Sequence, residues 1–409
     1  MGIVLSQQAN QSLGTDIRVS NILRGFDSTG IESTIFAPTR NASDGRDGSP
    51  FILGPRELQF DFVQRLVRQV MAAPALGNAI FWSPAVLRRQ IESLAKDLIA
   101  LEPDVDVLQG EQQLASLAAV QAGRTLGVPV VADLHGIWSE ELVAYGSIRR
   151  GGRADRNIRA LDSAIAKAAD HVTVVSTQMQ DYLVSELSAD PSRISVVLNG
   201  AIPQVSSVPM RPNPRRLVFA GMLSPIQNIK LLLEAVSIVH EKYPRIELYL
   251  TAKGELTAAV RNQCERMGLP ARFFWFEGSE RFFQFLASCD VGLLPANNDP
   301  GRQMAYPAKL YSYMAVGLPI VTNRIGSWSD IVEAEQIGIV TDNTPSGFAG
   351  GIMELLENPS RIHWYGERAL ALLRTKYAYA KEIEKFAAIY SNLCGPRVGS
   401  APTASLESR

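Results

Sequence analysis

A lysine near the start of a predicted helix is the clearest sign of chemistry in this chain. Residues 307–322 read Pro-Ala-Lys-Leu-Tyr-Ser-Tyr-Met-Ala-Val-Gly-Leu-Pro-Ile-Val-Thr, which predicts a helix followed by a buried strand. Pro307 is suited to begin the helix, because its missing N–H falls among groups that lack a partner in the first turn. Lys309 then opposes the helix dipole, which is unfavourable unless an anion is bound. The segment predicts an anion site; the alternative is a solvated surface lysine.

Two further polar segments follow predicted strands of the first half. Asp133-Leu-His-Gly136 follows one strand and places His135 at the edge of a sheet. Gly14-Thr-Asp-Ile-Arg18 follows the first strand, where Gly14 allows a ligand to approach the backbone closely or simply makes a turn. Asp16 fits either a ligand contact or the N-cap of the next helix.

The composition predicts a soluble protein of two domains. Its 409 residues exceed the size at which one hydrophobic core stops growing, so we expect two units of roughly 200 residues each. A net charge of −1 provides no overall field for nucleic acid, and three widely spaced cysteines fit a reducing compartment. With neither a signal-peptide pattern nor about 18 continuous apolar residues, we expect a cytoplasmic protein, at most peripheral at the inner membrane surface.

Short β-branched runs alternate with longer helical patterns, as in parallel sheets whose strands are joined by crossover helices. The predicted strands of the first half are Ile3–Leu5, Ser33–Phe36, Val105–Leu108, Val128–Ala132, Val172–Val175 and Ile194–Val197. Those of the second half are Arg216–Ala220, Ile246–Thr251, Arg272–Phe276, Val291–Pro295, Pro319–Thr322 and Gly338–Val340. A proline-dense stretch from Pro203 to Pro214 separates the two series and predicts a linker.

The pattern predicts an α/β fold of two Rossmann-like, doubly wound parallel-sheet domains that face each other across a cleft. We place the domains at residues 1–205 and 206–376. A C-terminal helix at 377–394 is expected to cross back to the first domain, and the tail at 395–409 to be disordered. Ligands of such sheets bind outside the carboxyl ends of the strands, so both domains should contribute to one site.

Several segments resemble, in the same order, the retaining glycosyltransferases of family 4, which have the GT-B architecture. The matching segments are Gly14–Val19, Asp133–Gly136, Val174–Ser176, Val197–Gly200, Val218–Pro225 and Pro307–Thr322. The lysine-bearing helix that ends in Gly-Leu-Pro is the most specific of them. The resemblance therefore covers nearly the whole chain.

The resemblance implies a metal-independent transferase that moves a sugar from a nucleotide-sugar donor to a glycan, lipid-linked or small-molecule acceptor with retention of anomeric configuration. No cofactor is implied beyond the donor substrate, and no protein nucleophile, because the leaving phosphate accepts the acceptor's proton. The acceptor then belongs to residues 1–205 and the donor to 206–376. The family places a histidine beside the donor sugar and the first loop near phosphate or acceptor, which makes His135 and Asp16 the catalytic candidates.

The donor site implied by the resemblance departs from the family's usual pattern. Its candidate residues are Gly14, Thr15, Gly221, Gln227, Asn228, Lys230, Arg302, Ala308, Lys309 and Ser312. The family's arginine and its lysine-glycine pair are replaced by Met222, Gln227 and Asn228, and its two bracketing glutamates by Met304 and Ser312. We expect Arg302, Lys309 and Lys230 to restore the positive charge, at about 1.5 to 3 kcal/mol for each charge-assisted contact.

Arginines crowd a short stretch of the first half, at positions 149, 150, 153, 156 and 159. They either form a solvated basic face or attract a phosphorylated lipid acceptor or an anionic membrane. We treat Arg149, Arg150 and Arg153, with Arg18, as candidate acceptor or membrane contacts.

Two alternatives follow from the replaced donor-site residues. One is a non-catalytic relative that keeps the fold and binds nucleotide, sugar or a partner enzyme. The other is a different GT-B enzyme, such as an epimerase or a phosphorylase. Donor hydrolysis or transfer would distinguish a transferase from a binding protein, which would bind tightly without turnover.

Overall fold

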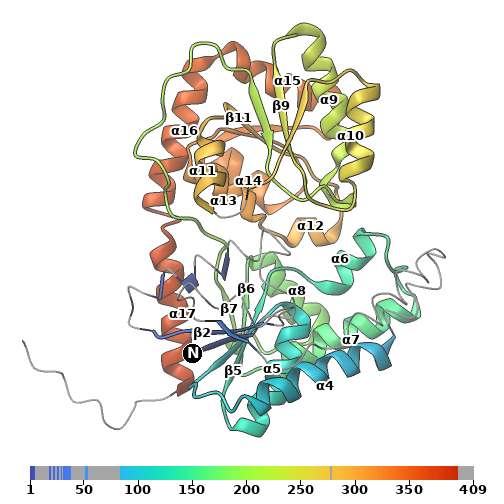
Figure 1. Ribbon diagram of the computed structural model, residues 1–409, viewed down its shortest axis with the longest axis vertical. Helices are drawn as coiled ribbons and strands as arrows, with labels where there is room; N and C mark the ends of the chain where they lie inside the picture. Colours follow the sequence, from blue (N-terminus) through green and yellow to red (C-terminus); the bar gives the residue numbers. More distant parts are fainter. Residues whose placement is uncertain are drawn as a thin grey trace, which may run out of the picture.

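The protein has two α/β domains stacked along its long axis (Figure 1). The computed structural model describes residues 1–4, 18–19, 22–23, 25–26, 29, 31–37, 51–53, 83–276 and 279–394. Within these residues, no helix is long and apolar enough to cross a membrane. The first domain lies at the bottom of Figure 1 and the second at the top.

The described strands of the first domain form one parallel sheet in the order β3-β2-β1-β4-β5-β6-β7. They are β1 (Gly2–Val4), β2 (Thr34–Ala37), β3 (Phe51–Leu53), β4 (Leu108–Glu111), β5 (Val130–Leu134), β6 (His171–Val174) and β7 (Ile194–Val196). The helices are α4 (Pro84–Ala100), α5 (Gln112–Leu126), α6 (Trp138–Ala144), α7 (Arg153–Ala168) and α8 (Thr177–Leu187), with a 3₁₀ turn at Pro191–Arg193. Every residue of β4 and β5 is buried, because helices cover both faces of the sheet.

The second domain repeats this topology, with strands in the order β10-β9-β8-β11-β12-β13. They are β8 (Arg216–Phe219), β9 (Glu247–Thr251), β10 (Ala271–Phe274), β11 (Val291–Leu294), β12 (Ile320–Asn323) and β13 (Gly338–Thr341). The helices are α9 (Ile229–Lys242), α10 (Thr257–Arg266), α11 (Ser279–Ala287), α12 (Pro300–Met304), α13 (Ala308–Ala315), α14 (Ser327–Ala334), α15 (Pro345–Glu357) and α16 (Pro359–Arg374), with a 3₁₀ turn at Pro225–Gln227. Both sheets thus have the doubly wound order, and their switch points lie between β1 and β4 and between β8 and β11.

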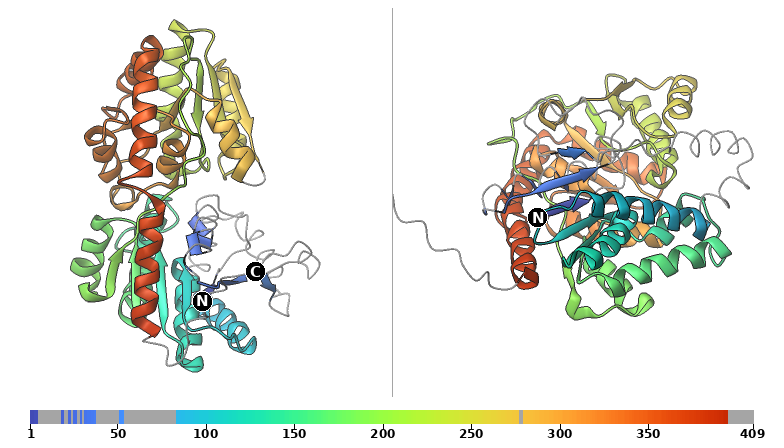
Figure 2. Two further views of the ribbon diagram at one scale, coloured as in Figure 1. Left: turned by 90° about the vertical axis from the view of Figure 1, so that its left-hand side faces the viewer. Right: turned by 60° about the horizontal axis from the view of Figure 1, so that its bottom comes forward.

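The chain returns to the first domain through its last described helix, α17 (Tyr379–Cys394). In Figure 2, α16 lies against the second domain and α17 continues from it along the first. Phe386 of α17 is buried in one apolar cluster with Ile3 of β1 and Val131 of β5. The Glu382 carboxylate also accepts a hydrogen bond from the backbone N–H of Leu198, at 2.8 Å. The domains are therefore joined by two chain crossings.

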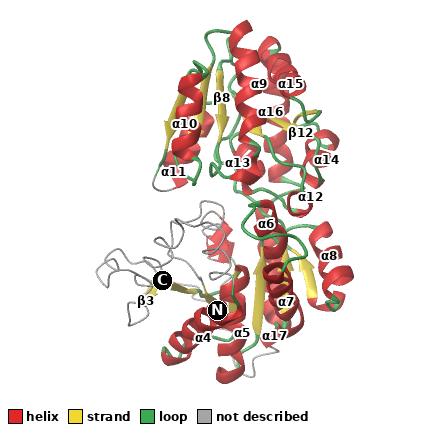
Figure 3. Ribbon diagram, turned by 90° about the vertical axis from the view of Figure 1, so that its right-hand side faces the viewer, coloured by secondary structure: helices red, strands yellow, loops and turns green. Residues whose placement is uncertain are grey.

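Three of the described helices were not predicted from the sequence. Two of them, α6 and α12, face each other between the domains (Figure 3). They have seven and five residues, too few for a helical period to show in the sequence. The third, α16, is separated from α15 by Asn358 alone. Strand β4 also begins later than expected, which places Glu111 at the carboxyl end of the sheet.

Candidate active site

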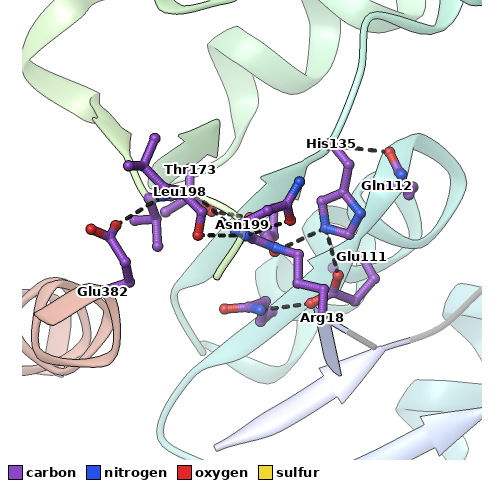
Figure 4. A network of polar contacts seen from close by, with 12 residues as sticks. Arg18, Glu111, Gln112, His135, Thr173, Leu198, Asn199 and Glu382 are labelled. Atoms are coloured by element: carbon purple, nitrogen blue, oxygen red, sulfur yellow. Dashed lines mark hydrogen bonds and ion pairs between the residues drawn. The ribbon is translucent and has the colours of Figure 1, made fainter. Parts of the chain in front are cut away.

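The carboxyl ends of three neighbouring strands bring polar side chains into one row. Glu111 of β4 is in register with Asp133 of β5, and Asp133 with Thr173 of β6. His135 follows two residues after Asp133, which puts its side chain on the same side of the chain. Because these positions lie next to the switch point of the first sheet, they belong to the crevice in which doubly wound domains bind ligands. Figure 4 shows the resulting network.

Arg18 is the cation of this network and is fully saturated by the protein. Its Nε and Nη2 donate to the two carboxylate oxygens of Asp133, each at 2.8 Å. The remaining N–H groups donate to Asn199 Oδ1 at 3.1 Å and to the carbonyls of Leu198 and Val197. Arg18 was expected to contact an acceptor or a membrane, but its side chain is 2 % exposed, and burial in this pair leaves it no free surface. We correct that expectation: Arg18 holds Asp133 and the crossing segment at 197–199 in place.

His135 is held between two carboxylates. Its Nε2 lies 3.1 Å from Asp133 Oδ2 and 3.1 Å from Glu111 Oε2. Burial by itself would lower the pKa of His135, but the charges and hydrogen bonds of Asp133 and Glu111 outweigh it and raise that pKa to about 9. The imidazole is therefore a cation near neutral pH. Its Nδ1 has no hydrogen-bond partner within the described residues, which leaves one N–H for a ligand.

Glu111 and the residue after it hold this row rigidly. Glu111 Oε1 accepts a hydrogen bond from Gln109 Nε2 at 2.7 Å, and Gln109 in turn accepts one from the Tyr390 hydroxyl of α17. Gln112 has a left-handed backbone with φ of 64°, an uncommon conformation for a residue other than glycine. Such strain persists only where the surroundings enforce it, as they do here at the junction of β4 and α5.

Glu111, Asp133 and His135 are the one group of described residues whose ligand atoms lie close enough together to bind a metal ion, within 4.8 Å of one another. The same atoms are already engaged. Asp133 accepts hydrogen bonds from Arg18 and from the Thr173 hydroxyl, the latter at 2.6 Å. The pKa of Asp133 lies well below its usual range because Arg18 and His135 outweigh the effect of burial. With a buried guanidinium beside it, the group is better suited to a hydrogen-bond network than to a divalent cation.

Across the cleft, Lys309 lies in the first turn of α13 and meets two of the predicted donor residues. Its Nζ donates to Gln227 Oε1 at 2.6 Å and lies 4.3 Å from the centre of the Phe219 ring. A Cβ atom at Gly221 would come within 2.4 Å of this Nζ, so the missing side chain makes room for the amine. The structure therefore brings Gly221, Gln227 and Lys309 together at the carboxyl end of β8.

The two cations near this position, Lys309 and Arg302, form no ion pair with a described residue. Burial lowers the pKa of Lys309 well below its usual value, and the cation of Arg302 lowers it further. The Arg302 guanidinium makes no hydrogen bond or ion pair within residues 83–276 and 279–394. Pro307 is the N-cap of α13, with Ala308 as its first residue, so the free N–H groups of the first turn add to the positive potential.

Three other residues predicted for the donor site have contacts of their own away from the Lys309 amine. The Lys230 side chain is 84 % exposed and lies 3.8 Å from Glu234 of the same helix, so it does not join Lys309. The Asn228 side chain caps α9 by accepting from the N–H of Leu231 at 3.3 Å. The Ser312 hydroxyl is buried and donates to the Ala308 carbonyl at 3.1 Å. These side chains have local contacts in the described structure, and their expected contact with the donor remains a prediction.

The arginines of the arginine-rich stretch differ in their contacts, since some pair with a carboxylate and others are exposed. Arg150 donates two hydrogen bonds to the buried Glu140 carboxylate, at 3.0 and 2.6 Å, and Arg159 donates a third at 2.6 Å. Arg150 is therefore an anchor of α6 and not the free contact that we expected. Arg149 and Arg153 are exposed and form no ion pair with a described residue. Gly14, Thr15 and Asp16 lie outside the described residues.

The sequence reasoning missed several residues of this site. Asn199 joins the domains: its Oδ1 accepts from Arg18, while its Nδ2 donates to the Tyr306 carbonyl at 2.7 Å. Glu111 and Glu141 were also missed. A signal existed only for Asn199, which lies in one of the segments that carried the family resemblance. The others depend on contacts between strands, helices or domains that no local pattern records.

Comparisons with known protein families match both domains. Residues 14–200 match the family described as "Glycosyl transferase 4-like domain", and residues 214–358 match "Glycosyl transferases group 1". D-inositol 3-phosphate glycosyltransferase 2 of Catenulispora acidiphila is 23 % identical over 416 residues, and the alignment covers 93 % of each chain. The two family matches follow each other in the order of the two domains.

Solved structures show the same fold. Sucrose-phosphate synthase of Thermosynechococcus elongatus superposes with a TM-score of 0.73 at 14 % identity, over 96 % of this chain and 98 % of the other. Anabaena Alr3699/HepE, solved in complex with UDP-glucose, gives a TM-score of 0.68 at 16 % identity, over 96 % and 99 % of the two chains. Both likenesses extend across both domains.

Proposed function

We propose a specific reaction for this chain, which belongs to the group 1 glycosyltransferases of the GT-B fold and is an enzyme of sugar transfer from nucleotide sugars. It moves the sugar of a nucleoside-diphosphate donor to a hydroxyl of an acceptor, with retention of anomeric configuration. The donor pyrophosphate lies at the start of α13 and the sugar extends toward His135. The acceptor enters from the side of the first domain.

One observation carries this proposal: Lys309 and Arg302 lie close together, and neither side chain forms an ion pair with a described residue. Two neighbouring cations repel each other, and burial adds to the cost. A pyrophosphate removes both penalties, because it accepts charge-assisted hydrogen bonds from the two side chains and from the first N–H groups of α13. The same contacts strengthen when the glycosidic bond breaks and negative charge develops on the leaving phosphate. In this proposal, Arg302 of α12 and Lys309 of α13 take the place of the arginine and lysine that the family usually has at this site.

His135 presents a charged N–H to the donor sugar. Since Asp133 and Glu111 fix the ring, its Nδ1–H can hydrogen-bond a sugar hydroxyl without reorganisation. No side chain is required as a nucleophile when the leaving phosphate accepts the acceptor's proton on the face from which it departs. We assign to His135 a role in sugar binding and transition-state hydrogen bonding.

We also propose that the reaction needs no metal or other cofactor. Lys309 and Arg302 supply the charge that a divalent cation would otherwise provide at the pyrophosphate. The test is turnover in the presence of excess EDTA, which should be unchanged. A loss of activity that Mg²⁺ or Mn²⁺ restores would instead assign the Glu111, Asp133 and His135 group to a metal ion.

The proposal is tested by a thermal-shift screen over UDP, GDP, ADP and dTDP and their common sugar conjugates. A ligand at 100 times its dissociation constant stabilises the protein by about 2.7 kcal/mol, which is readily detected. Lys309→Met and Arg302→Met should each weaken binding of the stabilising ligand about 10- to 100-fold. Lys242→Met on the exposed face of α9 is the matched control. Unchanged affinity in both variants would refute the assigned pyrophosphate site.

Anomeric configuration is tested on the reaction product. Proton coupling constants measured immediately after transfer should match the configuration of the donor. Inverted product would contradict the proposed mechanism while leaving sugar transfer intact.

For the acceptor, we propose attraction of an anionic lipid surface by Arg149 and Arg153, next to the start of α7. Each basic side chain near such a surface contributes about 1 kcal/mol. The Arg149→Ala/Arg153→Ala variant should therefore lose about 30-fold in binding to vesicles that contain anionic lipid, measured by sedimentation. The control is Arg245→Ala/Arg281→Ala, on exposed positions of the second domain. Equal binding to neutral vesicles would contradict this role.

A further inference from the structure

We infer that Glu141, on α6 of the first domain, determines donor specificity by accepting hydrogen bonds from hydroxyl groups of the transferred sugar. This inference rests on the proposed function, because it requires a nucleotide sugar that extends from Lys309 toward His135. It assigns to the first domain a carboxylate that contacts the sugar, in place of the two glutamates of the family that Met304 and Ser312 replace.

The carboxylate of Glu141 lies directly against the backbone that follows His135. A Cβ atom at Gly136 would come within 2.1 Å of Glu141 Oε1. Because Gly136 has no side chain, the Glu141 carboxylate can approach the backbone next to His135. Burial raises the pKa of Glu141, and its charged neighbours are Arg302, His135 and Asp299. Glu141 is thus near both the group proposed to contact the sugar and a cation proposed to contact the phosphates.

Helix α6 holds this position firmly from its other side. The N–H of Ser139 donates to the buried Asp162 of α7 at 3.0 Å. Glu140 is fixed by ion pairs with Arg150 and Arg159, at 2.6 Å each. Tyr145, one turn after Glu141, has Arg302 and Ser224 of the second domain among its neighbours, so this face of α6 looks across the cleft. The anchors fix the direction of Glu141 without using its carboxylate.

The Glu141 carboxylate is unused in the described structure. It accepts no hydrogen bond and forms no ion pair with any described residue, unlike Glu111, Asp133 and Glu140. Leaving a partly buried carboxylate without donors is costly, and hydroxyl groups are neutral donors that remove the cost. A phosphate would be repelled by the same charge. Sugar hydroxyls are therefore the complementary ligand.

The second domain has no carboxylate available for this task at its usual positions. The Met304 side chain, which replaces one of the family's glutamates, is buried among the core residues of the first domain. The Ser312 hydroxyl, which replaces the other, is occupied by the Ala308 carbonyl. Asp299 caps α12 by accepting from the N–H of Arg302 at 2.9 Å through Oδ1, while its Oδ2 is buried without a hydrogen-bond partner among the described residues. A carboxylate that replaces the two glutamates can come from the first domain, which forms the opposite wall of the cleft.

Isothermal titration of matched ligand pairs tests the inference: UDP with UDP-glucose, GDP with GDP-mannose, ADP with ADP-glucose, and dTDP with dTDP-glucose. The ratio of the two dissociation constants in the pair that wild type binds isolates the effect of the sugar. Glu141→Gln should weaken the nucleotide sugar about tenfold relative to its nucleoside diphosphate, the equivalent of one charge-assisted hydrogen bond. Gly136→Ala should have an effect of the same sign, because the added methyl displaces the carboxylate. Glu92→Gln, exposed on α4, should leave the ratio unchanged.

The outcomes separate this inference from the proposed function. If wild type binds no member of any pair, the proposed function fails and the inference falls with it. If wild type binds and Glu141→Gln changes the ratio by less than twofold, the inference alone is overturned. Equal weakening of both ligands would also overturn it, because a merely structural role for Glu141 predicts that result. Thermal unfolding of each variant verifies that it is folded.

Discussion

The two walls of the cleft differ in how their charges are balanced. On the first domain, Arg18, Asp133, Glu111 and His135 form a closed group in which each charge faces an opposite one. On the second domain, Lys309 and Arg302 lie near each other, and Lys309 is held by the neutral amide of Gln227. This group on the first domain is balanced without a ligand, whereas Lys309 and Arg302 form no ion pair with a described residue.

This difference indicates a division of labour. A closed network is rigid, so it can present His135 to a sugar in a fixed geometry at no cost during the reaction. An open pair of cations is unfavourable in the free protein, and that unfavourable energy is released when a pyrophosphate binds. Asn199 connects the walls, because it bonds Arg18 on one side and the Tyr306 carbonyl, two residues before α13, on the other. The segment before α13 is therefore linked structurally to the network that holds His135.

The largest expected effect is on the closed wall. Arg18→Met leaves the Asp133 carboxylate buried with its main partner removed, and we expect a loss of about 3 to 5 kcal/mol in the free energy of unfolding. Urea denaturation measures it. Arg18→Met/Asp133→Asn should recover part of the loss, because the uncompensated charge is gone. A loss below about 1 kcal/mol would contradict the inference that Arg18 balances the buried charge of Asp133.

A smaller effect is expected from pH. The pKa of His135 is raised from 6.5 to about 9, so its contribution to stability is fully present below pH 6.5 and is lost as pH rises to about 9. A change of this size corresponds to at most about 3 kcal/mol. The unfolding free energy of wild type should fall across this window relative to that of His135→Asn, whose profile serves as the control. Parallel profiles would contradict the paired imidazolium.

The smallest expected effect is on the unfolding free energy of Lys309→Met, and the sign of that change tests the comparison. Lys309→Met removes a cation whose pKa is lowered by burial, so the free protein should be equally stable or more stable by up to about 1 kcal/mol. We expect the same variant to lose donor binding, so stability and function should move in opposite directions. Urea denaturation without ligand measures the first quantity. A destabilisation comparable to that of Arg18→Met would show that Lys309 is a structural cation and would remove the contrast between the walls.

Much of the architecture follows from local sequence alone. Alternation of β-branched runs with helical patterns predicts two doubly wound domains, because strands covered on both faces by helices must be apolar throughout. The Pro-Ala-Lys segment similarly predicts the helix of Lys309, since the proline fixes where it begins. The motif order was sufficient to indicate the glycosyltransferase family and sugar transfer, both of which the comparisons bear out. The donor-site assignments remain predictions.

Other features depended on contacts that the sequence does not record. Arg18 and Asp133 are 115 positions apart, and their pairing turned an expected surface cation into a buried anchor. Arg150 changed role in the same way, since its partner Glu140 lies on a helix too short to be predicted. Free and paired charged side chains look identical in a sequence, because pairing depends on which residues the fold places within a few ångströms.

The sequence by itself thus determined the two sheets, the position of the lysine-bearing helix and the family, because each of these is written in residues close along the chain. The tertiary structure decided which charges are neutralised and which remain open to a ligand. Electrostatic energy depends on distance and burial in three dimensions, and strand register, the crossing segment at Asn199 and the facing of α6 and α12 set both.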